Sequence, residues 1–108
     1  MSAPTEAPSG FAVTASTSTS ISVSWQLPLE DFRHGVITGF KLFFKRKGSD
    51  DSTTILLIDS ASILTKTVNG LEVFTEYEFQ VLAFTSVGDG PKSSVKVAKT
   101  REDGKRNF

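Results

Sequence analysis

The chain has 108 residues, the length of one domain with a single hydrophobic core. Its 12 basic and 12 acidic side chains cancel to a formal net charge of zero, so no overall charge attracts nucleic acid or an anionic membrane. The absence of cysteine excludes disulfides and thiolate metal sites, and the apolar runs are far shorter than the roughly 20 residues that span a bilayer. We therefore expect neither nucleic acid nor direct membrane contact.

The N-terminal part of the chain predicts a flexible segment followed by two strands. Residues 1–7 are small and polar and are expected to form a flexible linker. A first strand is predicted at 9–15 and a second at 20–25, where apolar residues alternate with serine and end at Trp25 on the core face. Pro28 is expected to end the second strand, because proline has no N–H for a sheet ladder.

The middle of the chain predicts a long loop and two more strands. The polar loop at 29–35 contains His34, the one histidine of the chain. A third strand is predicted at 37–46, with three alternating apolar residues on one face and Phe43 on the other. A fourth is predicted at 53–59, where four consecutive apolar residues leave open which of them face the core.

The C-terminal part predicts three strands and a second linker. The strand at 63–69 ends in Asn69-Gly70, which is typical of a two-residue hairpin turn. We reject a hairpin because the residues that follow are needed to cross from one sheet to the other. Further strands are predicted at 76–85 and 93–100, and the charged residues 102–108 are expected to form a flexible linker. Seven short strands at this spacing predict an all-β sandwich.

Six short motifs occur in a fixed order along these strands. They are Pro8-Ser9, Trp25-Gln26-Leu27-Pro28, Thr38-Gly39-Phe40-Lys41-Leu42, Gly70-Leu71, Glu76-Tyr77-Glu78-Phe79-Gln80-Val81 and Gly88-Asp89-Gly90-Pro91. In this order they resemble the fibronectin type III family over residues 8–101. The resemblance implies a single module of a larger multidomain protein, folded as a seven-stranded antiparallel immunoglobulin-like β-sandwich.

The resemblance implies structural roles for three residues. The residue that matches Tyr77 forms a tyrosine corner, in which its hydroxyl bonds to backbone a few residues upstream and its ring packs beside the residue that matches Leu71. Trp25 fills the core between the sheets, a position that its apolar stripe also predicts. None of these residues is expected to perform chemistry.

No group of side chains predicts catalysis or metal binding. His34 has no second histidine or cysteine with which to complete a metal site, and no serine has a partner in a nucleophile motif. The paired carboxylates Glu30-Asp31 and Asp50-Asp51 lack the spacing of a calcium loop. We therefore predict no catalytic, metal or cofactor-binding residue, no cofactor and no enzymatic activity.

Strand alternation predicts an apolar patch on the outer face of one sheet. Phe43 lies opposite the core face of its strand, as do Leu82 and Phe84 on theirs. The two strands are neighbours in the family, so the three side chains are expected to share an exposed, candidate protein-binding surface. The alternative is that lysine stems such as that of Lys41 cover them, or that they only form stabilising cross-strand pairs.

Loops at one pole of the sandwich are an alternative candidate contact surface. Three connections are expected to cluster there, at 29–35, around 60–62 and at 86–92, with the candidate binding residues His34, Val87 and Asp89. Some relatives carry an integrin-binding Arg-Gly-Asp, but Val87 stands where arginine is needed, so this activity is not expected. The neighbouring Gly88 and Gly90 are expected to supply positive φ in a tight loop.

An odd number of strands places the ends of the domain at opposite poles, which suits end-to-end joining. The resemblance therefore implies a non-enzymatic interaction and spacer module, in the extracellular part of a cell-adhesion molecule or cell-surface receptor. Two alternatives stay open: an intracellular muscle or cytoskeletal scaffold, and an accessory domain of a multidomain enzyme such as a receptor phosphatase. The expected partners are a protein of unknown identity and adjacent domains of the same chain, and the isolated domain is expected to be monomeric.

Overall fold

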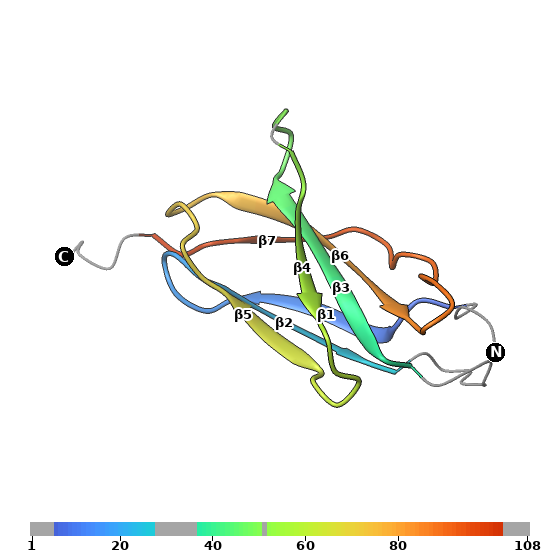
Figure 1. Ribbon diagram of the computed structural model, residues 1–108. Helices are drawn as coiled ribbons and strands as arrows, with labels where there is room; N and C mark the ends of the chain where they lie inside the picture. The colour runs from blue at the N-terminus through green and yellow to red at the C-terminus, as the bar shows by residue number, and fades with distance from the viewer. Residues whose placement is uncertain (1–5, 28–36, 51, 103–108) are drawn as a thin grey trace.

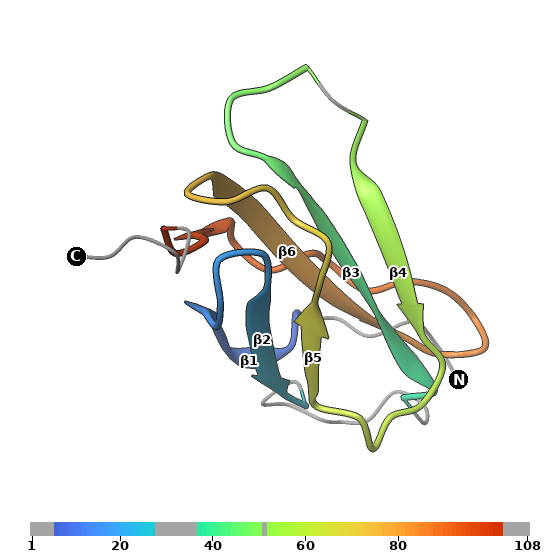
Figure 2. The same ribbon diagram turned by 90° about the vertical axis from the view of Figure 1, so that its left-hand side faces the viewer.

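The computed structural model describes residues 6–27, 37–50 and 52–102, which form seven strands in two antiparallel sheets (Figure 1). The strands are β1 (Ser9–Ala15), β2 (Ile21–Gln26), β3 (Gly39–Arg46), β4 (Thr54–Ile58), β5 (Thr65–Val68), β6 (Glu76–Phe84) and β7 (Lys96–Lys99). Their order is β1-β2-β5 in the smaller sheet and β4-β3-β6-β7 in the larger, and Figure 2 shows the two sheets as separate layers. The predicted all-β sandwich is confirmed.

The core lies between the two sheets and follows the alternation of the strands. The alternate residues Ile21, Val23 and Trp25 of β2 have no exposed surface. They meet the inner face of the larger sheet, where Trp25 packs on Phe40 with 5.4 Å between ring centroids. The core also contains Phe11, Leu42, Ile58, Val68, Leu71, Tyr77, Phe79, Val81 and Ala83. Burial of this apolar stripe against its counterpart is the main force that holds the sheets together.

Tyr77 holds the connection that crosses from β5 to β6. The crossing begins at Gly70, whose φ of 75° suits a residue without a Cβ. The backbone N–H of Leu71 then donates to the Thr19 carbonyl at 2.9 Å. The Glu72 N–H donates to the Tyr77 hydroxyl at 2.9 Å, and the Tyr77 ring is buried in the core. The structure thus contains the tyrosine corner that the resemblance implied, and no hairpin follows β5.

Thr100 is a second anchor of the same connection. Its side chain is 1% exposed and lies just after β7. The Thr100 Oγ1 accepts a hydrogen bond from the Thr75 N–H at 2.9 Å and donates to the Glu72 carbonyl at 2.7 Å. The Thr100 N–H also donates to the Thr75 carbonyl at 3.0 Å. The end of the last strand is therefore tied to the crossing connection by side chain and backbone together.

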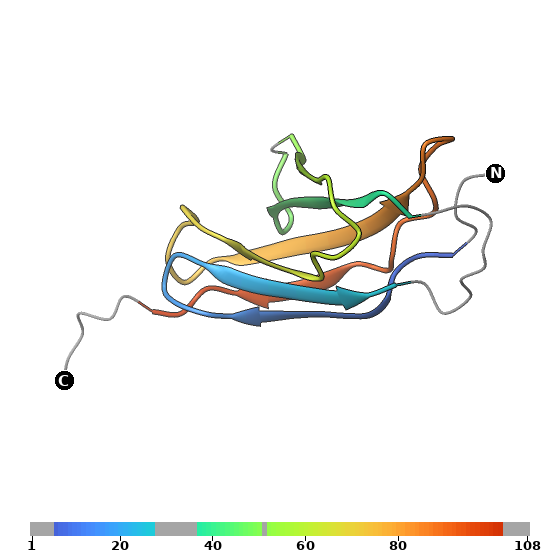
Figure 3. The same cartoon turned by 60° about the horizontal axis from the view of Figure 1, so that its bottom comes forward.

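The described chain enters and leaves the sandwich at opposite ends. Figure 3 shows β1 beginning at one end and β7 ending at the other, as the odd number of strands predicts. Because β3 is antiparallel to both β4 and β6, the connections that follow β4 and β6 lie at the end where β3 begins. Two of the three loops that were expected to cluster are therefore at one pole. The third, with His34, lies outside the described residues.

Candidate functional site

The outer face of the larger sheet carries the predicted apolar residues but does not expose them all. The register sets Lys41 beside Leu82 and Phe43 beside Gln80, and Phe84 is on the same face as Leu82. The three apolar side chains therefore share a face, as alternation predicts. The expected exposure is wrong for two of them, because Phe43 is 9% exposed and Leu82 is 4% exposed. Phe84 is half-buried.

The segment between β6 and β7 contributes to the burial of Phe43. The Ser93 N–H donates to the Val81 carbonyl at 2.8 Å, and the Val81 N–H donates to the Ser93 Oγ at 3.0 Å, so this segment runs beside β6. The Lys92 Nζ consequently lies 4.3 Å from the centroid of the Phe43 ring. A lysine ammonium at this distance makes a cation–π contact with the ring and shields its face from water. The contact favours the alternative in which lysine side chains cover the apolar residues.

Phe84 joins the sheet face to the neighbouring loop. A Cβ on Gly39 would lie 2.8 Å from the Phe84 Cζ, so the ring occupies the space that a side chain at position 39 would need. The Lys41 Nζ is 5.8 Å from the Phe84 ring centroid and 3.1 Å from the Asp89 Oδ2. Phe84 and Asp89 also form an isolated backbone bridge. Phe84 and Asp89, two of the predicted binding residues, are thus in one cluster with Lys41.

Backbone hydrogen bonds close the loop that carries Val87. The Thr85 N–H donates to the Gly88 carbonyl at 3.0 Å, and the Gly90 N–H donates to the Ala83 carbonyl at 2.8 Å. Neither Gly88 nor Gly90 has a positive φ, so the role expected for these glycines is wrong. The hydrogen-bonded turn forms with both glycines at negative φ, so it does not need the left-handed region. Val87 is 57% exposed in this loop.

Two residues that sequence reasoning did not assign extend the outer face. The register of β3 and β4 sets Ile55 beside Phe43 and Leu57 beside Lys41. Their side chains are 56% and 62% exposed, whereas Ile58 is buried in the core. The pairing with β3 therefore determines which side chains of β4 face the core, a question that the four consecutive apolar residues left open. The four consecutive apolar residues could have indicated this, because a strand with one buried face exposes every second side chain.

Phe74 is a second exposed apolar residue that the sequence did not single out. Among the described residues it is the one non-glycine with a positive φ, at 50°. Its side chain is 53% exposed, and the Lys99 Nζ lies 3.7 Å from its ring centroid. The Phe74 N–H donates to the Arg101 carbonyl at 3.1 Å, so the residue sits where the chain leaves β7. Strained backbone of this kind clusters at active sites, ligand clamps and switch regions.

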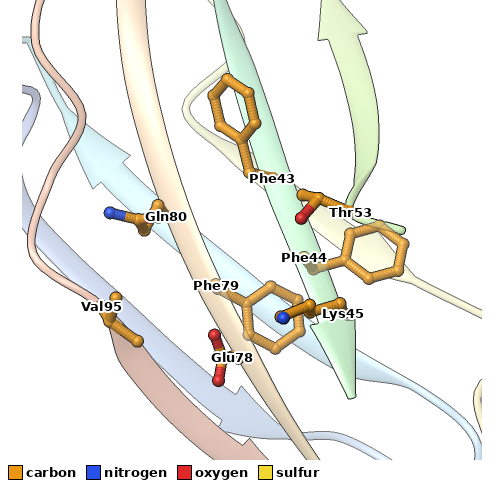
Figure 4. A pocket seen from close by; sticks show the side chains of 8 residues that line it. All are labelled: Phe43, Phe44, Lys45, Thr53, Glu78, Phe79, Gln80 and Val95. Atoms are coloured by element: carbon orange, nitrogen blue, oxygen red, sulfur yellow. The ribbon is translucent and has the colours of Figure 1, made fainter. Parts of the chain in front are cut away.

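A shallow depression on the outer face is too small for a ligand (Figure 4). Its volume is about 30 Å³. Binding pockets for small molecules are at least ~300 Å³. Residues from β3, from β6 and from the segments before β4 and β7 line it, namely Phe43, Phe44, Lys45, Thr53, Glu78, Phe79, Gln80 and Val95. Recognition on this face would therefore use surface contacts.

The described residues were also searched for metal-binding groups and membrane-spanning helices. Over residues 6–27, 37–50 and 52–102, no group of three or more histidine, aspartate or glutamate side chains is placed to hold a metal ion. The same part of the chain contains no helix of the length and apolar character needed to cross a membrane.

Comparisons with known proteins give a consistent result. The model of the fibronectin type III domain matches residues 6–99. Tyrosine-protein phosphatase Lar of Drosophila melanogaster is 39% identical over 97 residues, which are 89% of this chain and 5% of Lar. Protein sidekick-2 of Mus musculus is 37% identical over 103 residues, which are 93% of this chain and 5% of that protein. The crystal structure of the FN1–FN3 domains of chicken CNTN1 has a TM-score of 0.81 and 27% identity, and the match covers 94% of this chain and 34% of that one.

Proposed function

This chain belongs to the fibronectin type III family, whose module is non-catalytic, and we propose that it is an interaction and spacer module from the ectodomain of a cell-adhesion molecule or cell-surface receptor. The module would occupy residues 8–101, between linkers at 1–7 and 102–108. The observation that carries the proposal is the family match together with the opposite positions of the two ends of the sandwich.

The relatives support a place in a much longer chain. The segment spans about 5% of the length of Lar and of sidekick-2. A domain that is entered at one pole and left at the other adds length to a row of modules without folding the row back. Phe74 and its partner Lys99 lie at the exit pole, and we propose this exposed pair as a contact with an adjacent domain. The exposure of the Phe74 ring and its backbone hydrogen bond to Arg101 support this assignment.

We propose the loop after β6 as the contact surface for another protein. Exposed Val87 supports this proposal, as does Asp89, which the ion pair with Lys41 orients. Phe84 would contribute its half-buried ring next to them. Phe43 and Leu82 have little exposed surface, so they would stabilise the outer face by packing and would not contact the partner directly. His34 would join the same pole if its loop has the predicted position.

A second candidate function is an accessory domain of a multidomain enzyme. The name of Lar, tyrosine-protein phosphatase, favours this candidate, because the match covers a small part of a chain that is named for an enzyme. The module would then have the same contact and spacer role next to a catalytic domain. The sequence of the parent polypeptide distinguishes the two candidates directly.

Surface labelling tests the proposed location. Intact cells of the source organism are treated with a membrane-impermeant biotin reagent, and the parent polypeptide is isolated with an antibody raised against this chain. We expect a biotinylated polypeptide much longer than 108 residues. Labelling that requires permeabilised cells would contradict the proposal and favour the intracellular scaffold.

A further inference from the structure

The larger sheet has an edge strand, β4, at which a second copy of the chain could associate. β4 is the terminal strand in the order β4-β3-β6-β7, and Figure 2 shows no other described strand on its far side. An edge strand presents a row of backbone N–H and C=O groups that another strand can pair. Ile55 and Leu57 add two exposed apolar side chains directly beside this row.

The other edges of the sandwich have the protection that β4 lacks. The edge strand β5 has four residues and carries Lys66, a charge of the kind that blocks pairing with another chain. The edge strands β1 and β7 lie against each other across the two sheets. β4 has the sequence Thr-Ile-Leu-Leu-Ile, with no charge and no proline. Among the described edges it is the one best suited to accept another strand.

We propose that β4 pairs antiparallel with β4 of a second copy of this chain, which joins the two larger sheets into one. Residues that face each other in a continuous sheet must point to the same side. A two-fold axis at Leu56 satisfies this condition, because it sets Ile55 beside Leu57 of the second copy and Leu57 beside Ile55. The four exposed apolar side chains then form two cross-strand pairs on the outer face.

Neighbouring registers do not match these side chains. With the axis at Ile55, Leu57 would lie beside Thr53 of the second copy. With the axis at Leu57, Ile55 would lie beside the charged Asp59. Registers that differ by one residue would place an outer side chain beside an inner one. The axis at Leu56 is therefore the register that the exposed residues favour.

The contact is small, so the association should be weak. A strand of five residues from each copy buries well under the ~1,000 Å² of a stable interface, so we expect a dissociation constant on the order of 1 mM. The assembly stops at two copies, because the contact is isologous and uses both β4 edges. The chain is then a monomer at micromolar concentration, as its sequence led us to expect. The inference goes beyond the proposed function and does not depend on it.

Sedimentation equilibrium and NMR of the 108-residue chain between about 0.05 and about 3 mM test the pairing. We expect the average mass to rise above the monomer value of 11.7 kDa, with amide shifts that change along β4. Leu57→Glu and Ile55→Lys should each weaken the association about tenfold, because each places a charge beside an apolar residue in both cross-strand pairs.

An equimolar mixture of the two variants tests the register. In the mixed dimer the axis at Leu56 sets the new carboxylate beside the new ammonium and leaves the other pair apolar, so we expect association to return to near the original strength. Val97→Glu is the matched control, because Val97 is 41% exposed on the same face but on β7, and this change should leave association unaffected.

Three results would overturn the inference. They are a monomer mass up to the highest concentration, association that survives Leu57→Glu, and a mixture that stays as weak as the single variants. Loss of association with Val97→Glu to the same extent as with Leu57→Glu would also contradict it, because the contact would then use the face of the sheet and not its edge. Both β4 positions are more than half exposed, so the variants are expected to retain the native amide spectrum outside β4.

Discussion

At the scale of single residues, Tyr77 illustrates the difference between a residue that marks a fold and one that binds. Its hydroxyl accepts the Glu72 N–H at 2.9 Å, and its ring is 6% exposed. Tyr77→Phe should lower the free energy of unfolding by about 0.5 to 1.5 kcal/mol, the net value of one such hydrogen bond. Denaturant unfolding with an unchanged m-value measures this. A loss of partner binding larger than the loss of stability would contradict the structural role.

Thr100 should contribute more than Tyr77, because its buried hydroxyl makes two hydrogen bonds to the crossing connection. Thr100→Val keeps the shape of the side chain but removes the acceptor of the Thr75 N–H and the donor to the Glu72 carbonyl. We expect a loss of about 1 to 3 kcal/mol in the free energy of unfolding, since two hydrogen bonds of one buried hydroxyl are lost together. Thr14→Val, at an exposed position of β1, is the control and should change stability by less than about 0.5 kcal/mol. Equal effects of the two changes would refute the anchor.

Gly39 is required by the backbone carbonyl and the ring that lie against it. A methyl group at this position would meet the Ile58 carbonyl and the Phe84 ring. Gly39→Ala should therefore destabilise the chain by about 1 to 3 kcal/mol, the usual cost of overpacking, although alanine is otherwise acceptable in a strand. Amide shifts of Phe84 and its neighbours should change with it. A variant that is as stable as the original chain would show that neither the Ile58 carbonyl nor the Phe84 ring restricts this position.

At the scale of elements, the strand period predicted the sheet face on which each side chain lies, but not which segments cover that face. The stripe that ends at Trp25 identified the inner face of β2, and alternation placed Phe43 and Leu82 correctly on the outer face. The burial of Phe43 depends on the path of the segment around Lys92, and no periodicity encodes that path. The facing of β4 likewise depends on its register with β3, a contact between separate parts of the chain.

Because Leu82 is buried, its substitution should lower the stability of the fold. Leu82→Ala should cost about 2 to 4 kcal/mol of unfolding free energy, the range for a buried leucine, because the side chain is 4% exposed. Leu57→Ala is the control on the same face, and its side chain is 62% exposed. The control should cost less than about 0.5 kcal/mol. Similar small losses for both would restore the expectation of an exposed patch at Leu82.

At the scale of the whole molecule, two surfaces are available for different contacts. The pole with Val87 and Asp89 is built from the loop after β6, whereas the exit pole carries Phe74. In a row of such modules the exit pole would meet the next domain, and the loop with Val87 would lie at the opposite pole, where the chain enters. The resemblance predicted this arrangement in outline, because topology alone sets the poles. Phe74 was missed because an aromatic residue in a crossing connection has no periodic signal.

Photo-crosslinking on intact cells tests the central claim, that this module contacts another protein outside the cell. A photoreactive amino acid replaces Val87 in the parent polypeptide, and in a matched variant it replaces the exposed Thr14 on the other sheet. We predict that position 87 captures one defined cell-surface protein and that position 14 captures none. Capture from both positions alike, or from neither, would contradict the claim.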